Sequence, residues 1–459
     1  MVATSSEAGA EARRYGRSAG LLSAGIGSAG LLTYLYFALA SHNLTRPEYG
    51  QIVVLWSAVI MTISIIHRPV EQLLSRTVAE RRERALSIGR PLRVAGVIQA
   101  GIAAAAAALA LLLRTPLENN LLDGKTTLYW VLVVGVVCYG ASFYARGFLA
   151  GSRRFGLLAC LLLNEAFGRC AFALAVAIGI ASGQSVIALG IAAAPLLSLV
   201  VVPLGFAGRA HGSTSQAPAM PPRSEIDFTL ASGGSFAAAV LLVMLSEQTL
   251  LNGGPLLVRA SVGAAAAGFI FNVLMVARAP LLLFQGIATS LLPHLTRLRS
   301  RASSEGDAAF RLSVRGTITA IAVFAVAVCV VMAAAGPQLM QIAFGSKFTY
   351  DRLGLLCVSA GMGLYLAATT LNQAAVAQGQ VRRAAICWLV CAASFLAWNL
   401  LPVLSDYRRV ELGFLAAAMA LCALLYRLYA HPVTRPADLV EPGSSKELEA
   451  RLAAAEEAG

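Results

Sequence analysis

The sequence predicts an all-α polytopic membrane protein, and three observations support this prediction. Of the 459 residues, 58% are hydrophobic and only 13% are charged, whereas soluble domains average roughly 45–50% apolar and about 25% charged residues. The mean hydropathy is +0.72. The apolar residues come in runs of roughly twenty, the length that crosses a bilayer core as a helix. Such runs exclude a transmembrane β-barrel, whose strands alternate over about ten residues.

Twelve apolar windows are the expected transmembrane helices. They span residues 19–40, 50–67, 94–113, 128–145, 157–181, 186–207, 228–251, 264–292, 316–336, 354–378, 384–405 and 412–430. The first window is too long for a signal-peptide core and lacks a clear cleavage pattern, so we expect it to be a retained helix. An even number of helices places both termini on one side of the membrane.

A polar segment divides the chain into two halves of six helices. Residues 208–227 are rich in Gly, Ser and Pro, which is linker composition. The expected organisation has five parts. They are a cytoplasmic N-terminal segment 1–18, a first six-helix bundle 19–207, a cytoplasmic linker 208–227, a second six-helix bundle 228–430 and a cytoplasmic tail 431–459.

Short motifs indicate that the two bundles are internal repeats. The segment Arg46-Pro-Glu-Tyr-Gly50 precedes or opens the second helix, and Arg259-Ala-Ser-Val-Gly263 opens the eighth. Two further matches follow in the same order. They pair Arg68-Pro69 with Arg278-Ala-Pro280, and Ala150-Gly-Ser-Arg153-Arg154 with Gly379-Gln-Val-Arg382-Arg383. Six helices per repeat imply a parallel relation, with an axis along the membrane normal.

The basic residues predict the orientation. With Arg68 and Arg427 counted at their helix ends, 26 of the 36 Lys and Arg residues lie on the side of the termini, 8 lie opposite and 2 lie inside windows. Short loops rich in Arg stay cytoplasmic, so we expect both termini there. The formal charge of +13 therefore reflects topology, and no nucleic acid partner is expected. The Arg residues at 76–93 give the strongest signal, with contact to anionic lipid as the alternative interpretation.

The remaining composition predicts no cofactor. All eight cysteines lie in apolar windows, where they behave as small hydrophobic residues, and the five histidines are scattered. We therefore expect neither a metal site nor a disulfide framework. The 33 Arg against 3 Lys point to a GC-rich bacterial genome, and so to a bacterial inner membrane.

The fifth predicted helix carries two charges inside the membrane. Glu165 and Arg169 stand four residues apart, on one helix face. Arg169 lies about 18 Å beyond Leu157, close to the bilayer midplane. A charge there costs roughly 2.5–3.5 kcal/mol on insertion scales, so it needs a partner or a purpose. The pair either neutralises itself and stabilises the bundle, or lines a water-filled cavity where the guanidinium meets an anionic substrate.

Arg278 and Arg68 both stand near a proline. Arg278 lies in the eighth predicted helix two positions before Pro280, and a helix break at membrane depth is tolerated where it lines a cavity. This pattern favours a site, with a kink that serves only packing as the alternative. Arg68-Pro69 is the first-half equivalent, although its place near the cytoplasmic edge also suits snorkelling to the interface.

Glu247 is the remaining acidic candidate. We expect it one turn from the outer end of the helix 228–251, either as a proton- or cation-coupling group or as an interfacial carboxylate. Four amide side chains within other windows are expected to join helices by hydrogen bonds worth roughly 0.6 kcal/mol each. They are Asn164, Asn272, Asn372 and Gln373.

Four stretches carry a family resemblance. They are Leu44-Thr-Arg-Pro-Glu-Tyr-Gly50, Ala145-Arg-Gly-Phe-Leu-Ala-Gly-Ser-Arg-Arg-Phe155, Asn164-Glu-Ala-Phe-Gly-Arg169, and Ala277-Arg-Ala-Pro280 through Leu291-Leu-Pro293. In this order, and with six helices in each half, they resemble the polysaccharide transporter (oligosaccharide flippase) family of the multidrug/oligosaccharidyl-lipid/polysaccharide (MOP) superfamily. The similarity runs from about residue 15 to residue 430.

The resemblance implies a MATE-like fold of two six-helix bundles around a cavity that alternates between the two membrane faces. It also implies movement of a polyprenyl-(pyro)phosphate-linked oligosaccharide to the outer leaflet for surface polysaccharide biosynthesis. Arginine matches phosphate oxygens bidentately, so Arg68, Arg169 and Arg278 are candidates for the head group. Glu165 would orient Arg169, and Glu247 is the coupling candidate. Expected partners are the lipid-linked glycan, membrane lipids, and a glycan polymerase or glycosyltransferases.

Two other function classes remain. A proton- or sodium-coupled multidrug (MATE-like) antiporter usually has a carboxylate in its first helix, and residues 19–40 contain none, which favours the glycolipid without excluding export of organic cations. The branch that carries peptidoglycan precursor typically has fourteen helices, against twelve here.

A membrane glycosyltransferase or polymerase needs acidic groups or a large outer domain. The longest expected outer loop, 337–353, has 17 residues and one acid, Asp351, so we expect no enzyme.

Overall fold

The computed structural model describes residues 5–84, 86–207, 230–279 and 304–431. Within these ranges, eleven helices are long and apolar enough to cross a membrane, and Ala264–Arg278 is a shorter apolar helix. The prediction of an all-α polytopic membrane protein with about twelve helices is confirmed. The later part of the eighth window, including Pro280, lies outside the described residues, as do the linker 208–227 and the tail from 432 onward.

The first half contains the following elements in chain order. They are α1 (Ser5–Asn43), α2 (Arg46–Ile66), α3 (Arg68–Glu83), α4 (Gly89–Leu112), the π-helix η1 (Pro116–Leu121), α5 (Thr126–Gly151), α6 (Phe155–Ala177), α7 (Gln184–Ser198), the 3-10 helix η2 (Leu199–Val201) and α8 (Val202–Ala207). A single residue, His67, separates α2 from α3, so these two helices form one long span with a break.

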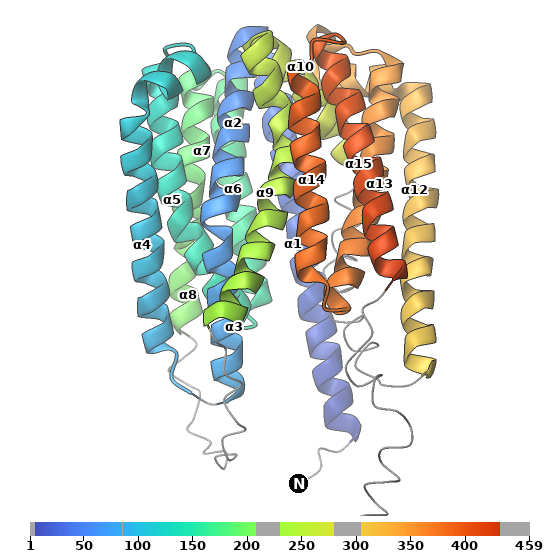
Figure 1. Ribbon diagram of the computed structural model, residues 1–459. Coiled ribbons are helices and arrows are strands. Elements are labelled where there is room, and N and C mark those ends of the chain that lie inside the picture. Colours follow the sequence, from blue (N-terminus) through green and yellow to red (C-terminus); the bar gives the residue numbers. More distant parts are fainter. Residues whose placement is uncertain (1–4, 85, 208–229, 280–303, 432–459) are drawn as a thin grey trace, which may run out of the picture.

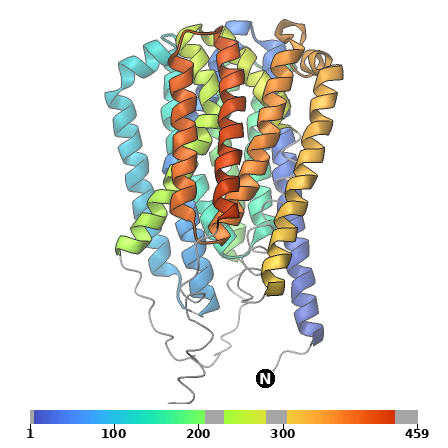
Figure 2. The same cartoon turned by 45° about the vertical axis from the view of Figure 1, so that its right-hand side comes forward.

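The second half contributes the remaining elements of the described residues. It contains α9 (Leu230–Ser261), α10 (Ala264–Arg278), α12 (Ser304–Phe344), the 3-10 helix η3 (Ser346–Phe348), α13 (Arg352–Ala377), α14 (Val381–Leu400) and α15 (Asp406–Ala430). Figure 1 shows the helices of both halves running along one common axis, with α4 and α12 at opposite edges and α9 crossing obliquely between the halves. Figure 2 shows the same layout with α12 and α1 at one edge.

The helix bundle has a terminal end and a far end. The terminal end carries the start of α1 and the end of α15, and the far end carries the connections α1–α2, α9–α10 and α12–α13 (Figure 1). The sequence-based charge count places the terminal end in the cytoplasm.

Local sequence signals explain where helices begin at the far end. Thr45 and Glu48 form a capping box at the start of α2, with Pro47 in the first turn. The Asp351 carboxylate caps α13 by accepting a hydrogen bond from the Gly354 N–H at 3.1 Å. These caps satisfy backbone N–H groups that have no partner within the helix.

Several helices extend beyond their apolar windows, which corrects two positions. The helix α9 continues to Ser261, so Glu247 lies fourteen residues, or about 21 Å, from its far end and near its middle, not one turn from the outer end. The helix α5 continues to Gly151, so Arg146, counted as a cytoplasmic loop residue, belongs to the helix. Hydropathy windows end where apolar residues give way to polar ones, whereas a helix continues as long as its backbone hydrogen bonds do.

The N-terminal segment 1–18 is likewise partly helical, because α1 begins at Ser5. The break between α2 and α3 occurs at His67, directly before Arg68-Pro69, and α10 ends at Arg278. The two sequence positions paired as repeat equivalents thus both stand at a helix end. The turns before α6 and α14 also correspond, since Arg153 and Gly379 both adopt positive φ, 53° and 79°. The domain boundaries themselves remain a proposal.

Candidate functional site

A cavity of about 350 Å³ lies in the terminal half of the first bundle. Its walls come from α1, α2, α3, α5 and α6. Apolar side chains make most of the lining: Leu22, Ile26, Ile60, Ile63, Phe143, Leu158 and Leu162. The polar and charged lining residues are Ser64, Arg68, Glu71, Tyr139, Arg146 and Glu165. The cavity therefore combines an apolar enclosure with four charged groups.

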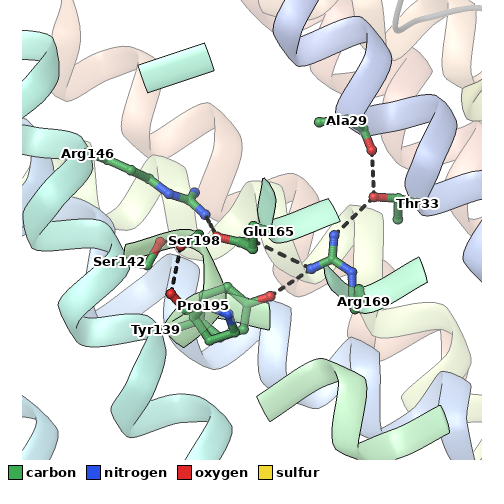
Figure 3. Close-up of polar contacts among 9 residues, drawn as sticks. All are labelled: Ala29, Thr33, Tyr139, Ser142, Arg146, Glu165, Arg169, Pro195 and Ser198. Atoms are coloured by element: carbon green, nitrogen blue, oxygen red, sulfur yellow. Dashed lines mark hydrogen bonds and ion pairs between the residues drawn. The ribbon is translucent and has the colours of Figure 1, made fainter. Parts of the chain in front are cut away.

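Glu165 is the centre of this polar cluster (Figure 3). Its Oε2 accepts hydrogen bonds from the Arg146 guanidinium and from the Ser142 hydroxyl, the latter at 3.1 Å. Its Oε1 lies 3.5 Å from Nη1 of Arg169. One carboxylate thus serves two guanidinium groups. The predicted i,i+4 pair of Glu165 and Arg169 is present, but Arg146 is the closer partner.

Arg169 is held by four helices and is only 4% exposed. Its Nη1 donates to the Tyr139 hydroxyl at 2.8 Å and its Nη2 donates to the Thr33 hydroxyl at 3.1 Å (Figure 3). The guanidinium also stacks over the Trp56 ring, 4.5 Å from its centroid. Since both terminal nitrogens are occupied and Arg169 is not part of the cavity lining, its geometry is that of a cross-link between helices.

Arg68 has a different environment. It is half-buried, lines the cavity, and makes no hydrogen bond or ion pair with the residues that the structure describes. Its charge is felt by Glu71, one turn on in α3, which also lies near Arg146 and Glu165. The cluster contains three arginines and two glutamates, so its formal net charge is +1. Of the arginines, Arg68 has the most freedom to meet a ligand.

The second bundle holds a smaller polar group, made by Glu247, Arg278 and Tyr365. The Tyr365 hydroxyl donates to Oε1 of Glu247 at 2.9 Å. The Arg278 Nη2 donates to the Leu251 carbonyl oxygen at 2.6 Å, and its charge interacts with Tyr365, Glu247 and Tyr34 of α1. The structure therefore brings Glu247 and Arg278 together, but not with Glu165 and Arg169.

The predicted amide contacts are partly present. Asn272 accepts a hydrogen bond from the Tyr49 hydroxyl, and Asn372 accepts one from the Trp388 indole N–H at 3.1 Å. Asn164 is exposed on α6. Asn272 thus joins α10 to α2 of the other half, as expected of an interhelical amide.

The two bundles are closed against each other at the far end, where α2 crosses α10. Gly50 lies so close to the Ala264 carbonyl that a Cβ there would overlap it, and a Cβ on Gly268 would lie 3.4 Å from the Gly50 Cα. Small residues permit this close approach of two helices in a membrane. The Phe348 ring covers the crossing, 5.0 Å from the ring of Tyr49.

A chain of polar contacts runs beside this crossing. Arg259 of α9 forms an ion pair with Asp123, whose Oδ2 accepts from the Gln51 amide at 2.6 Å. The Gln51 side-chain oxygen in turn accepts from Gln184 at 2.7 Å. The described contacts between the halves therefore hold the far end together, whereas the cavity lies in the terminal half.

Sequence reasoning missed Arg146, Glu71 and Tyr139. A signal was present in α5, because Tyr139, Ser142 and Arg146 recur at i, i+3 and i+7 and so form one polar stripe. This stripe was hidden because Arg146 stands one position beyond the apolar window. Glu71 carried no such signal, since a polar residue near a helix end has many roles.

Comparisons with known proteins agree on the fold. Neither a family model nor a curated protein sequence matches the chain. Among solved structures, the inward-facing conformation of a multidrug resistance MATE family transporter of the MOP superfamily aligns with a TM-score of 0.59 at 13% identity, covering 87% of this chain and 95% of that one. A mutant of the Vibrio cholerae MATE transporter VcmN aligns with a TM-score of 0.60 at 16% identity, covering 91% and 97%.

A third structure is that of a MOP superfamily transporter from Pyrococcus furiosus, described as having a binding pocket of reverse polarity that suggests a different function. It aligns with a TM-score of 0.61 at 13% identity, covering 91% of this chain and 96% of that one. At such low identity these likenesses show a shared fold. The chain is a multi-pass membrane protein with the MATE-like fold.

Proposed function

We propose that this protein is an alternating-access transporter that flips a polyprenyl-(pyro)phosphate-linked oligosaccharide from the cytoplasmic to the outer leaflet. The observation that carries the proposal is Arg68, a cation without an ion-pair partner among the described residues, at the wall of a largely apolar cavity. A half-buried cation without a carboxylate partner costs free energy, which a bound phosphate offsets. The fold, shared with transporters, supplies the two bundles that such movement requires.

The cavity's chemistry fits the head of an anionic amphiphile. Arg68 would meet phosphate oxygens, and the apolar lining would cover the first part of the chain. A volume of about 350 Å³ is at the low end of ligand pockets, so it would hold the phosphate and adjoining atoms and leave the glycan in solution. In this proposal the charge of Arg146 adds to the positive electrostatic potential at the cavity wall. Arg169 is a positioning residue that holds the Glu165 side chain in place.

Because the far end is closed, we assign the structure to the conformation whose cavity lies on the side of the termini. With the termini assigned to the cytoplasm by their basic residues, the cavity belongs to the cytoplasmic side and the Tyr49, Gly50 and Asp123 contacts form an outer gate. Loading would occur from the inner leaflet. Release would require the outer gate to separate, which breaks the Asp123–Arg259 ion pair and the Tyr49–Asn272 hydrogen bond.

A cellular experiment tests this function. In a clean deletion strain, lipid-linked glycan should accumulate in the cytoplasmic leaflet and surface glycan should disappear, and wild-type protein should restore it. Normal surface glycan in the deletion strain would remove the basis of the proposal.

A multidrug antiporter is the second candidate, and Glu247 is the observation that favours it. This carboxylate lies near the middle of α9, accepts a hydrogen bond from Tyr365 and interacts with the charge of Arg278, so its protonation would change the electrostatic balance of this group. Under this alternative, Glu247→Gln abolishes gradient-driven efflux of a cationic drug while expression is retained. Glu80→Gln, an exposed glutamate of α3, serves as the control.

A further inference from the structure

A second hollow lies on the side of the first bundle that faces away from the second bundle, apart from the cavity. It is a groove of about 650 Å³ between α4, α5, η2 and α8, at the edge of the molecule that α4 forms in Figure 1. Small residues of α4 and α5 open it: Gly96, Ala100, Ala103, Gly140 and Ala141. Gln99 and Tyr144 are its polar lining residues, and the Tyr144 hydroxyl already donates to the Leu92 carbonyl oxygen at 2.9 Å.

The groove lies between helices that are candidate membrane spans. The helix α4 is a candidate membrane span, and its side chains are largely exposed, with Val97 74% and Leu112 80% accessible. Large exposed aliphatic side chains on a spanning helix face lipid chains. An apolar groove at this position suits a chain of a membrane lipid.

Charge at the mouth of the groove selects the head group. Arg93 stands three and seven residues before the lining residues Gly96 and Ala100, so it continues their face of α4 one turn toward the terminal end. On the opposite wall, Arg154 donates to the Leu204 carbonyl oxygen at 3.3 Å, next to the lining residue Pro203. Two cations thus flank the mouth at the end where basic residues gather.

The floor of the groove touches the helix break beside the cavity. Nε2 of His67 lies 2.9 Å from the Val136 carbonyl oxygen, and its Nδ1 lies 2.6 Å from the Gln99 amide nitrogen. A carbonyl only accepts, so His67 carries its proton on Nε2 and receives the Gln99 hydrogen bond on Nδ1. His67 ends α2 directly before Arg68. A molecule in the groove therefore borders the wall that positions Arg68.

We propose that this groove binds an anionic lipid of the leaflet at the terminal end, with one chain in the groove and the head group between Arg93 and Arg154. The site is distinct from the transport cavity. Its ligand is a bound lipid of the membrane and not the transported substrate. The bound lipid would stabilise the conformation of the α2–α3 junction, because Gln99 lines the groove and donates a hydrogen bond to His67.

The test is lipid binding by the purified full-length protein, measured by native mass spectrometry with phosphatidylglycerol and with phosphatidylcholine. We expect one phosphatidylglycerol to bind more tightly than phosphatidylcholine. The variant Arg93→Gln should weaken that binding about fivefold, the effect of one basic residue at a membrane surface. Ala100→Phe, which fills the groove from an exposed position, should remove it.

Two matched controls separate the groove from general lipid contact. Ala104→Phe adds the same ring to an exposed position of α4 outside the groove, and Arg84→Gln removes one exposed charge at the end of α3. Both should bind phosphatidylglycerol as the wild type does. Equal binding by Ala100→Phe and Ala104→Phe, or no preference for phosphatidylglycerol, would overturn the site, whatever the protein transports.

Discussion

Glu165 shows at the scale of single residues how one buried carboxylate organises a membrane bundle. It holds Arg146 and Arg169, which come from different helices, and Arg169 extends the network to Thr33 and Tyr139. Removing one partner of a buried ion pair leaves the other charge without compensation, a loss larger than the worth of the pair itself. The stabilising role of this network is therefore independent of any ligand.

We expect Glu165→Gln to destabilise the protein by about 3–5 kcal/mol, because two buried guanidinium groups lose their carboxylate. Thermal or denaturant unfolding in detergent measures this change. The control is Glu80→Gln, whose carboxylate accepts from Arg76 at 2.7 Å on the exposed side of α3 and should contribute about 0.3–0.5 kcal/mol. Equal effects of the two substitutions would show that the Glu165 cluster is not buried as described.

Charge outside the spanning segments gives a pH-dependent contribution. Partial burial raises the pKa of the Asp351 carboxyl, but hydrogen bonds from Arg408 and from the Gly354 N–H outweigh it, so the pKa lies below its ordinary value. A lowered pKa means that this carboxylate stabilises the fold above its unfolded pKa of about 3.9 and that the contribution is lost as the pH falls through the lower, folded value.

The variant Asp351→Asn keeps the capping side chain of α13 but removes the charge. We expect its unfolding temperature to lie below that of the wild type at pH 5–7, and the gap to close as the pH falls below about 4. Unfolding followed by intrinsic fluorescence across this range checks the sign. A gap that widens in acid would contradict the assigned role.

At the scale of elements, the crossing of α2 and α10 explains how the two halves stay together at the far end. The contact depends on Gly50, because a Cβ at that position would occupy the space of the Ala264 carbonyl group. Neither backbone can relax without moving a whole helix. The crossing is thus a steric fit at the far end, reinforced by Tyr49 and Asn272.

We expect Gly50→Ala to lower the free energy of unfolding by about 1–3 kcal/mol, the range for overpacking a close contact. Gly101→Ala in α4 is the control, because a Cβ there meets nothing within 4 Å and alanine is the better helix former by about 0.8–1 kcal/mol. Unfolding measurements should therefore move in opposite directions for the two variants. A stabilised Gly50→Ala protein would mean that the halves are not in contact at this crossing.

At the scale of the whole molecule, composition and hydropathy were sufficient to predict the fold class and the approximate number of spanning helices that the described residues form. The position of Glu165 and Arg169 inside the fifth spanning helix was also predictable, since a charge within an apolar run is visible in the sequence. Their neighbours were not. Arg146 lies nineteen residues before Glu165 and on another helix, so only the packing of α5 on α6 determines that the two side chains meet.

The same reason explains the error at Glu247. Its depth depended on the length of α9, which extends through Asn252 and Gly253 to Ser261 because these residues remain hydrogen-bonded within the helix and buried against neighbours. Hydropathy alone places the end of the helix near Leu251. The division that puts Glu165 with Arg169 and Glu247 with Arg278 likewise follows from tertiary structure.

Reconstituted flipping tests most directly whether the cavity beside Arg68 accepts the phosphate of a lipid-linked glycan. The measurement is the rate at which polyprenyl-pyrophosphate-linked oligosaccharide in proteoliposomes becomes accessible to an impermeant glycosidase. The wild type should move it, and Arg68→Gln should slow it by about tenfold or more, the loss of one charge-assisted interaction, without lowering the unfolding temperature. Arg84→Gln should move it at the wild-type rate. Equal rates for wild type and Arg68→Gln, or no movement by the wild type, would contradict the account.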